Sequence, residues 1–305
     1  MLNSKIETNR AQDQRQGILF ALAAVMIWSG FIVVSRKAGT STLLPNDTMF
    51  LRYATCATLL FPVWLFRYRF NLFEPRFLLI TLVGGLIYAA CVFRGFSLTP
   101  AGHAAVLLPG SMPMMIAVCS ALTRTETIRR SQWLAIGLIL AGLALLLKTP
   151  HLNEGYAWLL AASLAWSLYS VSIKRLGISP WQGTISMALL TCLVYVPVYM
   201  VLPKNLFNAD WNDIVLQMVY QGFLATVVQM LLFVQAVRLL GPARVGIFMG
   251  LVPIFAGLLA VALLHEPFSP ELGLALVLVT AGAWTAHSGR PIPTRFFNSQ
   301  TKSGV

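Results

Sequence analysis

The chain of 305 residues is 57% hydrophobic and only 10% charged, with a mean hydropathy of +0.74. A soluble globular protein carries about a quarter charged residues, so this composition predicts an integral membrane protein with room for about ten spans of ~20 residues. The formal net charge of +12 does not indicate a nucleic-acid-binding protein, because Lys and Arg lie in small groups between apolar runs rather than on one solvated face.

Apolar runs bounded by charges, Pro and Gly predict ten helices. The first run is long for a signal-peptide core and further spans follow it, so we expect it to be retained. We expect disordered cytoplasmic tails at 1–16 and 289–305, with helices at about 17–36, 47–66, 76–98, 102–123, 131–149, 155–174, 180–202, 213–238, 242–264 and 269–288.

The basic residues predict the orientation of these helices. With the N-terminus inside, sixteen Lys and Arg fall in inner segments and four in outer ones. Cytoplasmic segments carry the excess of Lys and Arg in membrane proteins. We therefore expect a multi-pass protein of the inner cell membrane with both termini in the cytoplasm.

A set of residues in the first half of the chain recurs in the second half at a nearly constant spacing. This recurrence predicts two five-helix halves, 17–149 and 155–288. Five is an odd number, so the second half must enter the membrane in the opposite sense, as an inverted repeat. The matched pairs are Gly17/Gly155, Trp28/Trp166, Ser29/Ser167, Arg36/Lys174, Lys37/Arg175, Gly39/Gly177, Pro113/Pro253, Glu126/Glu266, Ala141/Ala281 and Gly142/Gly282.

This order of features resembles the EamA family of the drug/metabolite transporter superfamily. Each half has a Trp in its first helix, an internal Pro and a terminal Glu in its fourth helix, and a Gly in its fifth helix. The stretch MFLRYATCATLLFP is also similar to the family's second helix, which carries an early Arg. The usual Gly before the Glu is replaced by Thr125 and His265. The resemblance covers about 17–288 and implies transport of amino acids, related metabolites or drugs.

Two arginines lie within predicted spans, Arg52 early in the second and Arg94 late in the third. Their repeat counterparts are apolar, and no acidic residue lies deep in a span to pair with them. Such groups are costly in a bilayer unless paired or hydrated. They predict contact with an anionic or carboxylate-bearing substrate, or alternatively snorkelling to the outer interface or bonds to helix carbonyls.

Aromatic and amide side chains supply further candidates. Trp28 and Trp166 lie too deep for interfacial belts and either line a central cavity or pack, and Tyr88 and Tyr169 share this ambiguity. The eighth helix carries four glutamines. At about 100° per residue Gln221 and Gln235 fall within about 40° of each other. Gln229, nearest the midplane, is the predicted substrate contact, with interhelical hydrogen bonding as the alternative.

Pro113 and Pro253 interrupt the fourth and ninth helices, where proline removes a backbone donor. They predict hinges for alternating access, or static kinks. Glu126 and Glu266 end the same helices on opposite membrane faces. They are candidate gate residues that pair with a base in one state, or local stabilisers of the next helix N-terminus.

We expect no cofactor and no metal site, since the four His are scattered and no Walker motif is present. The sequence thus predicts an all-α membrane protein, a secondary transporter whose partners are a small-molecule metabolite and the lipid bilayer, acting as a monomer or homodimer. A sensory or structural membrane subunit and an intramembrane enzyme are the alternatives, the last lacking a deep acidic dyad or paired His.

Overall fold

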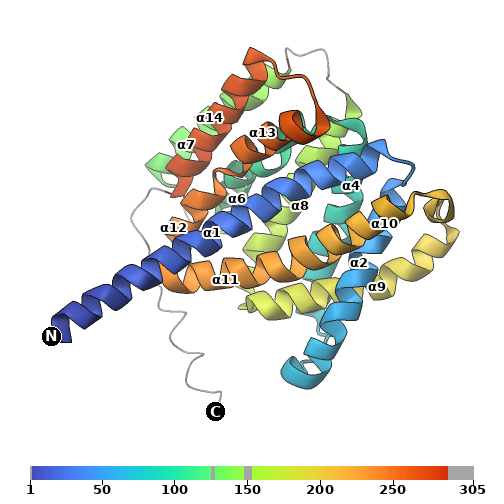
Figure 1. Cartoon of the computed structure of the whole chain (residues 1–305), viewed down its shortest axis with the longest axis horizontal. Coiled ribbons are helices and arrows are strands. Elements are labelled where there is room, and N and C mark those ends of the chain that lie inside the picture. The colour runs from blue at the N-terminus through green and yellow to red at the C-terminus, as the bar shows by residue number, and fades with distance from the viewer. Residues whose placement is uncertain (1, 125–127, 148–152, 288–305) are drawn as a thin grey trace.

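The computed structural model describes residues 2–124, 128–147 and 153–287, and these residues form helices and connecting turns without a β-strand. Figure 1 shows the helices as one bundle, with the N-terminal part of α1 projecting from it. The α-helices are α1 (Leu2–Thr40), α2 (Pro45–Val63), α3 (Pro75–Ile80), α4 (Tyr88–Leu98), α5 (Ala101–Ala105), α6 (Met112–Leu122), α7 (Arg130–Leu146), α8 (Glu154–Arg175), α9 (Pro180–Val201), α10 (Trp211–Gln217), α11 (Gln229–Leu240), α12 (Pro242–Met249), α13 (Val252–Leu264) and α14 (Pro270–His287).

Five short helices of other types continue or connect these elements. Four are π-helical: η1 (Trp64–Tyr68), η2 (Thr81–Ile87), η3 (Val106–Gly110) and η5 (Met218–Val228), whereas η4 (Leu206–Asn208) is a 3₁₀ turn. Shifting η2 along the chain by the interval that separates Trp28 from Trp166 places it inside η5. The third helix of each half is therefore π-helical over equivalent residues. π-helices are rare in proteins as a whole, and those that occur are often at functional sites.

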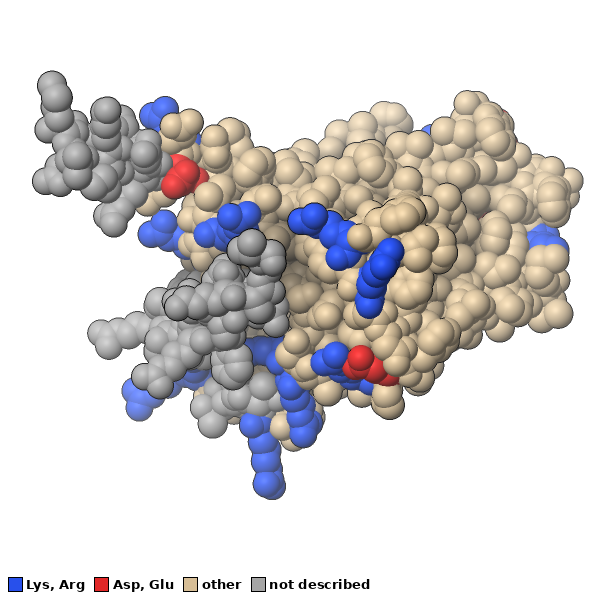
Figure 2. Space-filling model, turned by 90° about the horizontal axis from the view of Figure 1, so that it is seen from below, with Lys and Arg blue, Asp and Glu red and all other residues tan. Residues whose placement is uncertain are grey.

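Eight helical stretches of the described chain are long and apolar enough to cross a membrane. The surface in Figure 2 agrees with membrane-spanning helices. Lys and Arg gather mostly toward one end of the molecule, at the left of the view, and the rest of this face is largely uncharged. The predicted spans 131–149 and 269–288 correspond to α7 and α14, which have 17 and 18 residues and are not among the eight.

The first helix begins earlier than the sequence predicts. Residues 2–16 were expected to be disordered, yet α1 starts at Leu2. That expectation is wrong because the segment contains no Gly or Pro before Gly17 and is rich in Lys, Arg, Gln and Glu. These polar residues propagate a helix well, so polarity alone did not predict its end. The expected C-terminal tail lies outside the described residues.

The fourth and ninth helices, expected at 102–123 and 242–264, are each broken near the middle. The fourth runs through α5 and η3 and restarts after Ser111 as α6, and the ninth stops at Gly250 and restarts as α13. Pro113 and Pro253 lie in the first turns of the restarted helices, where the missing N–H is not needed. The prediction that proline interrupts both helices is confirmed.

The two halves pack through reciprocal contacts between equivalent helices. The first helix of one half packs on the third helix of the other, as α1 on α11 and α8 on α4. The second helices pair as α2 with α9, and the fifth as α7 with α14, which run side by side at the edge of the bundle in Figure 1.

Two close contacts repeat this exchange at atomic detail. A Cβ on Gly85 of η2 would lie 2.0 Å from Thr191 Oγ1, and one on Gly222 of η5 would lie 2.4 Å from Thr55 Cβ. The two threonines are separated by nearly the same interval of chain as the two glycines, and this interval is close to that of the repeat. The third helix of each half thus meets the second helix of the other through the same Gly–Thr pair.

Candidate functional site

An aromatic cluster joins the two halves of the chain. Trp28 of α1 and Trp166 of α8 have ring centroids 6.5 Å apart, and Trp166 also lies 4.9 Å from Tyr88 and 5.0 Å from Tyr169. Both tryptophans are half-buried, whereas both tyrosines are buried. The structure therefore brings these four predicted residues together, with the repeat-matched tryptophans facing each other across the junction.

Arg52 is buried in α2, with 6% of its surface exposed. Its Nη1 donates a long hydrogen bond of 3.5 Å to Gln221 Oε1, and its guanidinium carbon lies 5.2 Å from the Phe31 ring centroid and 5.8 Å from that of Tyr53. Burial rules out snorkelling to water as the account of this residue. A buried guanidinium with one weak hydrogen bond remains under-satisfied.

Gln221, the hydrogen-bond partner of Arg52, and Gln217, four residues before it on the same predicted helix, both bond to α1. We call Ser35, Arg52, Gln217 and Gln221 the Arg52 cluster; sequence reasoning did not single out Gln217. Gln221 Nε2 donates to Ser35 Oγ at 2.7 Å, and Gln217 Nε2 donates to the Val34 carbonyl at 3.2 Å. Both side chains are fully buried. Their close spacing, one helical turn apart, was the available signal.

The remaining glutamines do not join this cluster. The helical-wheel expectation that Gln221 and Gln235 share a face is wrong, since Gln221 is buried and Gln235 is exposed and accepts from Arg238. The reason is η5, because a π-helix advances each residue by less than the ~100° of an α-helix. Gln229 begins α11 half-buried, so its contact with substrate stays a prediction.

Arg94 occupies a different environment from Arg52. It is exposed and forms an ion pair of 3.0 Å with Glu154 at the start of α8, an acidic partner outside the predicted spans that the sequence did not indicate. It also borders a groove of about 590 Å³ between α2, α4 and α9, whose lining is mostly apolar and does not include Arg52. The two predicted arginines therefore do not converge on one pocket.

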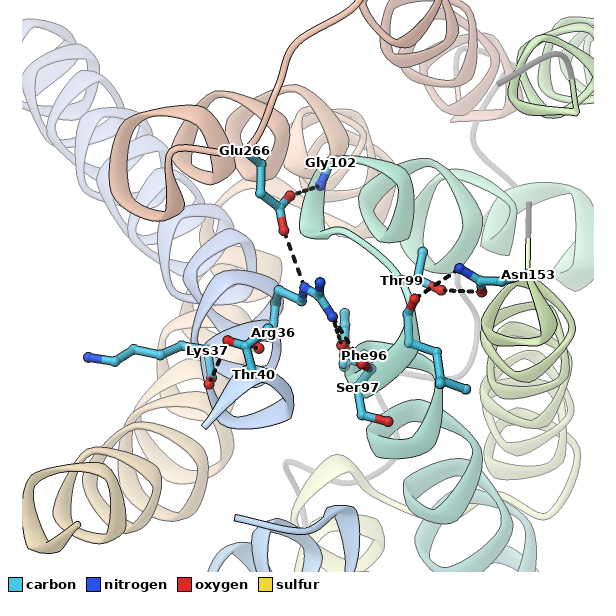
Figure 3. A network of polar contacts seen from close by, with 10 residues as sticks. Arg36, Lys37, Thr40, Phe96, Ser97, Thr99, Gly102, Asn153 and Glu266 are labelled. Atoms are coloured by element: carbon cyan, nitrogen blue, oxygen red, sulfur yellow. Dashed lines mark hydrogen bonds and ion pairs between the residues drawn. The ribbon is translucent and has the colours of Figure 1, made fainter. Parts of the chain in front are cut away.

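Glu266 joins helices that are far apart in the sequence (Figure 3). Its Oε1 lies 3.3 Å from Arg36 Nε at the end of α1, and its Oε2 accepts from the Gly102 N–H of α5 at 3.2 Å. Arg36 Nη1 also donates to the carbonyls of Phe96 and Ser97 at the end of α4, at 3.0 and 3.1 Å. We call Arg36, Glu266, Gly102, Phe96 and Ser97 the Arg36–Glu266 tie.

The geometry at His265 aims Glu266 into this tie. His265 ends α13 with φ of 53°, in the left-handed region that glycine adopts at no steric cost. This is the position at which the resemblance to the EamA family expects Gly. Glu266 satisfies a free first-turn amide of α5 rather than of α14, the helix that follows it. Its repeat counterpart Glu126 lies outside the described residues.

No group of three or more His, Cys, Asp or Glu side chains within the described part of the chain has the arrangement of a metal site. The arrangement offers instead an aromatic surface at the junction, a buried cation and a polar tie at one end. Groups of these kinds are suited to contacting a small molecule through stacking, hydrogen bonds and charge.

Comparison with known proteins assigns the chain to a family. The model of the EamA-like transporter family matches it twice, over residues 15–148 and 153–286. The chain belongs to the EamA-like transporter family. One match lies in each half of the chain, and this member of the family is a multi-pass membrane transporter.

Relatives of this EamA protein agree with the assignment. A protein of Bacillus subtilis (strain 168) called "Uncharacterized transporter YyaM" is 20% identical over 308 residues, covering 94% of this chain and 98% of its own. A solved structure described as "Crystal structure of protein" matches 88% of this chain and 96% of its own with a TM-score of 0.60 and 19% identity, which supports the fold alone.

Proposed function

We propose that this EamA protein is a secondary transporter with ten spans in two inverted five-helix halves. It moves a small organic metabolite, whether amino-acid-like, carboxylate-bearing or drug-like, by alternating access. The observation that carries the proposal is the exchange of equivalent contacts between the halves, from helix pairs down to the Gly85–Thr191 and Gly222–Thr55 contacts. Such a two-fold relation lets the two halves swap conformations around a central substrate.

The central substrate path, in this proposal, runs past the Trp28–Trp166 contact. Large half-buried aromatic side chains at a junction between two halves suit an apolar portion of a small molecule. The matched origin of the two tryptophans means that each half contributes one wall, so a relative movement of the halves changes the space between them.

The hinges are the breaks at Pro113 and Pro253 together with the π-helical η2 and η5. Backbone groups released at such breaks are tolerated within a protein interior, and breaks of this kind concentrate bending. The tie between Arg36 and Glu266 holds the ends of α1, α4 and α13 to the start of α5. By the charge-based orientation it closes the outer side, with both termini in the cytoplasm.

Counterflow in proteoliposomes tests transport. Vesicles containing the purified protein are loaded with an unlabelled metabolite extract and diluted into labelled compounds of the same pool. Transient accumulation of label above equilibrium, absent from protein-free vesicles, is the expected result. No accumulation with any pool of amino acids, organic acids and apolar drugs would refute the transporter proposal and favour a structural or sensory subunit.

A further inference from the structure

The charge of Arg52 is not neutralised by any ion pair in the described chain. The four ion pairs found there use Arg36, Lys37, Arg76 and Arg94. Arg52 Nε is fully buried without a hydrogen-bond partner. A guanidinium offers five N–H donors in a planar fork, and its fork is suited to a carboxylate. One edge of the Arg52 fork is therefore available.

The acidic residue nearest to Arg52 in sequence within α2 is already engaged. Asp47 accepts from the Leu44 and Asn205 amides at 2.9 and 3.0 Å and from the Tyr199 hydroxyl at 2.6 Å. Its carboxylate holds the connection after α9 against the N-terminus of α2. It is thus committed to structure and does not serve as the counterion of Arg52.

A free acceptor lies in the same cluster. The Val34 carbonyl can only accept, so the Gln217 atom facing it must be the amide nitrogen. Gln217 Oε1 is then left buried without a partner. The same logic orients Gln221, because Arg52 can only donate to its Oε1. The cluster thus presents an unfilled donor edge on Arg52 and an unfilled acceptor on Gln217.

The fold itself does not require these polar residues. At the offset that relates Trp28 to Trp166, every member of the cluster has an apolar counterpart. The equivalent half-to-half contact is therefore built without buried charge or amide groups, which are costly to bury unpaired. Each polar member and its counterpart are Ser35/Ile173, Arg52/Leu190, Gln217/Leu79 and Gln221/Val83.

We propose that Arg52, Gln217 and Gln221 recognise a small carboxylate that carries a hydrogen-bond donor, such as a hydroxyl, next to the carboxyl group. This rests on the proposed transport function and deepens it. The carboxylate takes the free edge of the Arg52 fork, and the donor group takes Gln217 Oε1. Phe31 and Tyr53 flank the guanidinium and supply the aromatic surface for an apolar tail.

The site is connected to the Arg36–Glu266 tie through consecutive residues of α1. Val34 and Ser35 hold Gln217 and Gln221, and the next residue, Arg36, holds Glu266. A ligand that fills the cluster therefore acts on the same turn of α1 that keeps this end closed. In the described conformation the cluster is occluded, since Arg52, Gln217 and Gln221 are all buried.

Binding to purified protein in lipid nanodiscs tests the proposal independently of transport. The probes are 3-phenyllactate, 3-phenylpropionate, which lacks the hydroxyl donor, and the uncharged methyl ester of 3-phenyllactate. Calorimetry should rank the hydroxy acid first, 3-phenylpropionate about 2- to 10-fold weaker, and the ester at least tenfold weaker.

Variants assign these differences to residues. Arg52→Gln should weaken both acids at least tenfold and leave the ester unchanged, and Gln217→Leu should reduce 3-phenyllactate to the affinity of 3-phenylpropionate. Arg175→Gln, an exposed arginine at the end of α8, is the control and should bind like wild type.

An ester that binds as well as the acid would overturn the proposal with wild-type protein alone, even if Arg52→Gln does not fold. Failure of all three probes to bind protein that is active in counterflow would also overturn it, while the transport function would stand. Protein that binds the acids with the predicted ranking but shows no counterflow would support the site and contradict the transport function.

Discussion

Replacing Glu266 by Gln should loosen the end of the molecule at which the Arg36–Glu266 tie joins α1, α4, α5 and α13, and so test the proposed gate. The substitution removes the charge from two hydrogen bonds, to Arg36 Nε at 3.3 Å and to the Gly102 amide at 3.2 Å. Arg36 keeps its bonds to the Phe96 and Ser97 carbonyls. The side chains of Arg36 and Glu266 are 18% and 15% exposed, so solvent screens their interaction only in part.

The magnitude follows from these contacts. A hydrogen bond to a charged group contributes about 1.5–3 kcal/mol, but both bonds are long and the amide of Gln can still accept one. We expect a loss of about 1–2 kcal/mol from the closed state, which raises the open-to-closed ratio about 5- to 30-fold. The free energy of unfolding should fall by a similar or smaller amount.

Labelling of a cysteine beneath the tie measures this ratio. Ile32 lies one turn before Arg36 on α1 and is fully buried. In protein whose four native cysteines are replaced, Ile32→Cys reacts with a membrane-impermeant maleimide, added outside intact cells, only when this end opens. The labelling rate should rise about 5- to 30-fold with Glu266→Gln, because it follows the open population.

The ion pair of Arg94 with Glu154 provides the matched control. Its side chains are 49% and 62% exposed, and exposed pairs contribute about 0–1 kcal/mol. Glu154→Gln should therefore change the labelling rate less than about fivefold. A Glu266→Gln rate within twofold of the parent, or a Glu154→Gln effect of equal size, would refute the assignment of the tie as a gate.

Three further predictions concern the centre and the topology. Gly85→Ala should lower the thermal unfolding temperature and Thr191→Ala should partly restore it, because the added methyl meets Thr191 Oγ1. Thr55→Ala should rescue Gly222→Ala less well, because the added methyl there meets both Cγ2 and Cβ of Thr55 and alanine keeps the Cβ. Trp166→Ala should lower stability by about 3–5 kcal/mol in denaturant titrations and reduce counterflow, because it removes three ring contacts; full activity would exclude it from the substrate path. Fluorescent-protein fusions at either terminus should fluoresce, and a dark fusion at one end would contradict the cytoplasmic assignment.

Local patterns were sufficient to predict most of the helices, since an apolar run long enough to cross a bilayer leaves the backbone little alternative to a helix. They failed at the N-terminus of α1, where a polar segment without Gly or Pro continues the helix from Leu2. They failed again in η5, because the π-helical turn is not encoded by a residue signature and shifts the faces on which Gln221 and Gln235 lie.

The sequence by itself determined the membrane class, the duplication and the breaks at Pro113 and Pro253, because composition, repeat spacing and proline act locally along the chain. Only the tertiary structure separated Arg52 from Arg94, which look alike in sequence. Burial and pairing depend on residues brought from distant helices: Gln221 stands 169 positions from Arg52, and Glu154 stands 60 from Arg94. One arginine is thereby left buried with an open donor edge, and the other is neutralised at the surface.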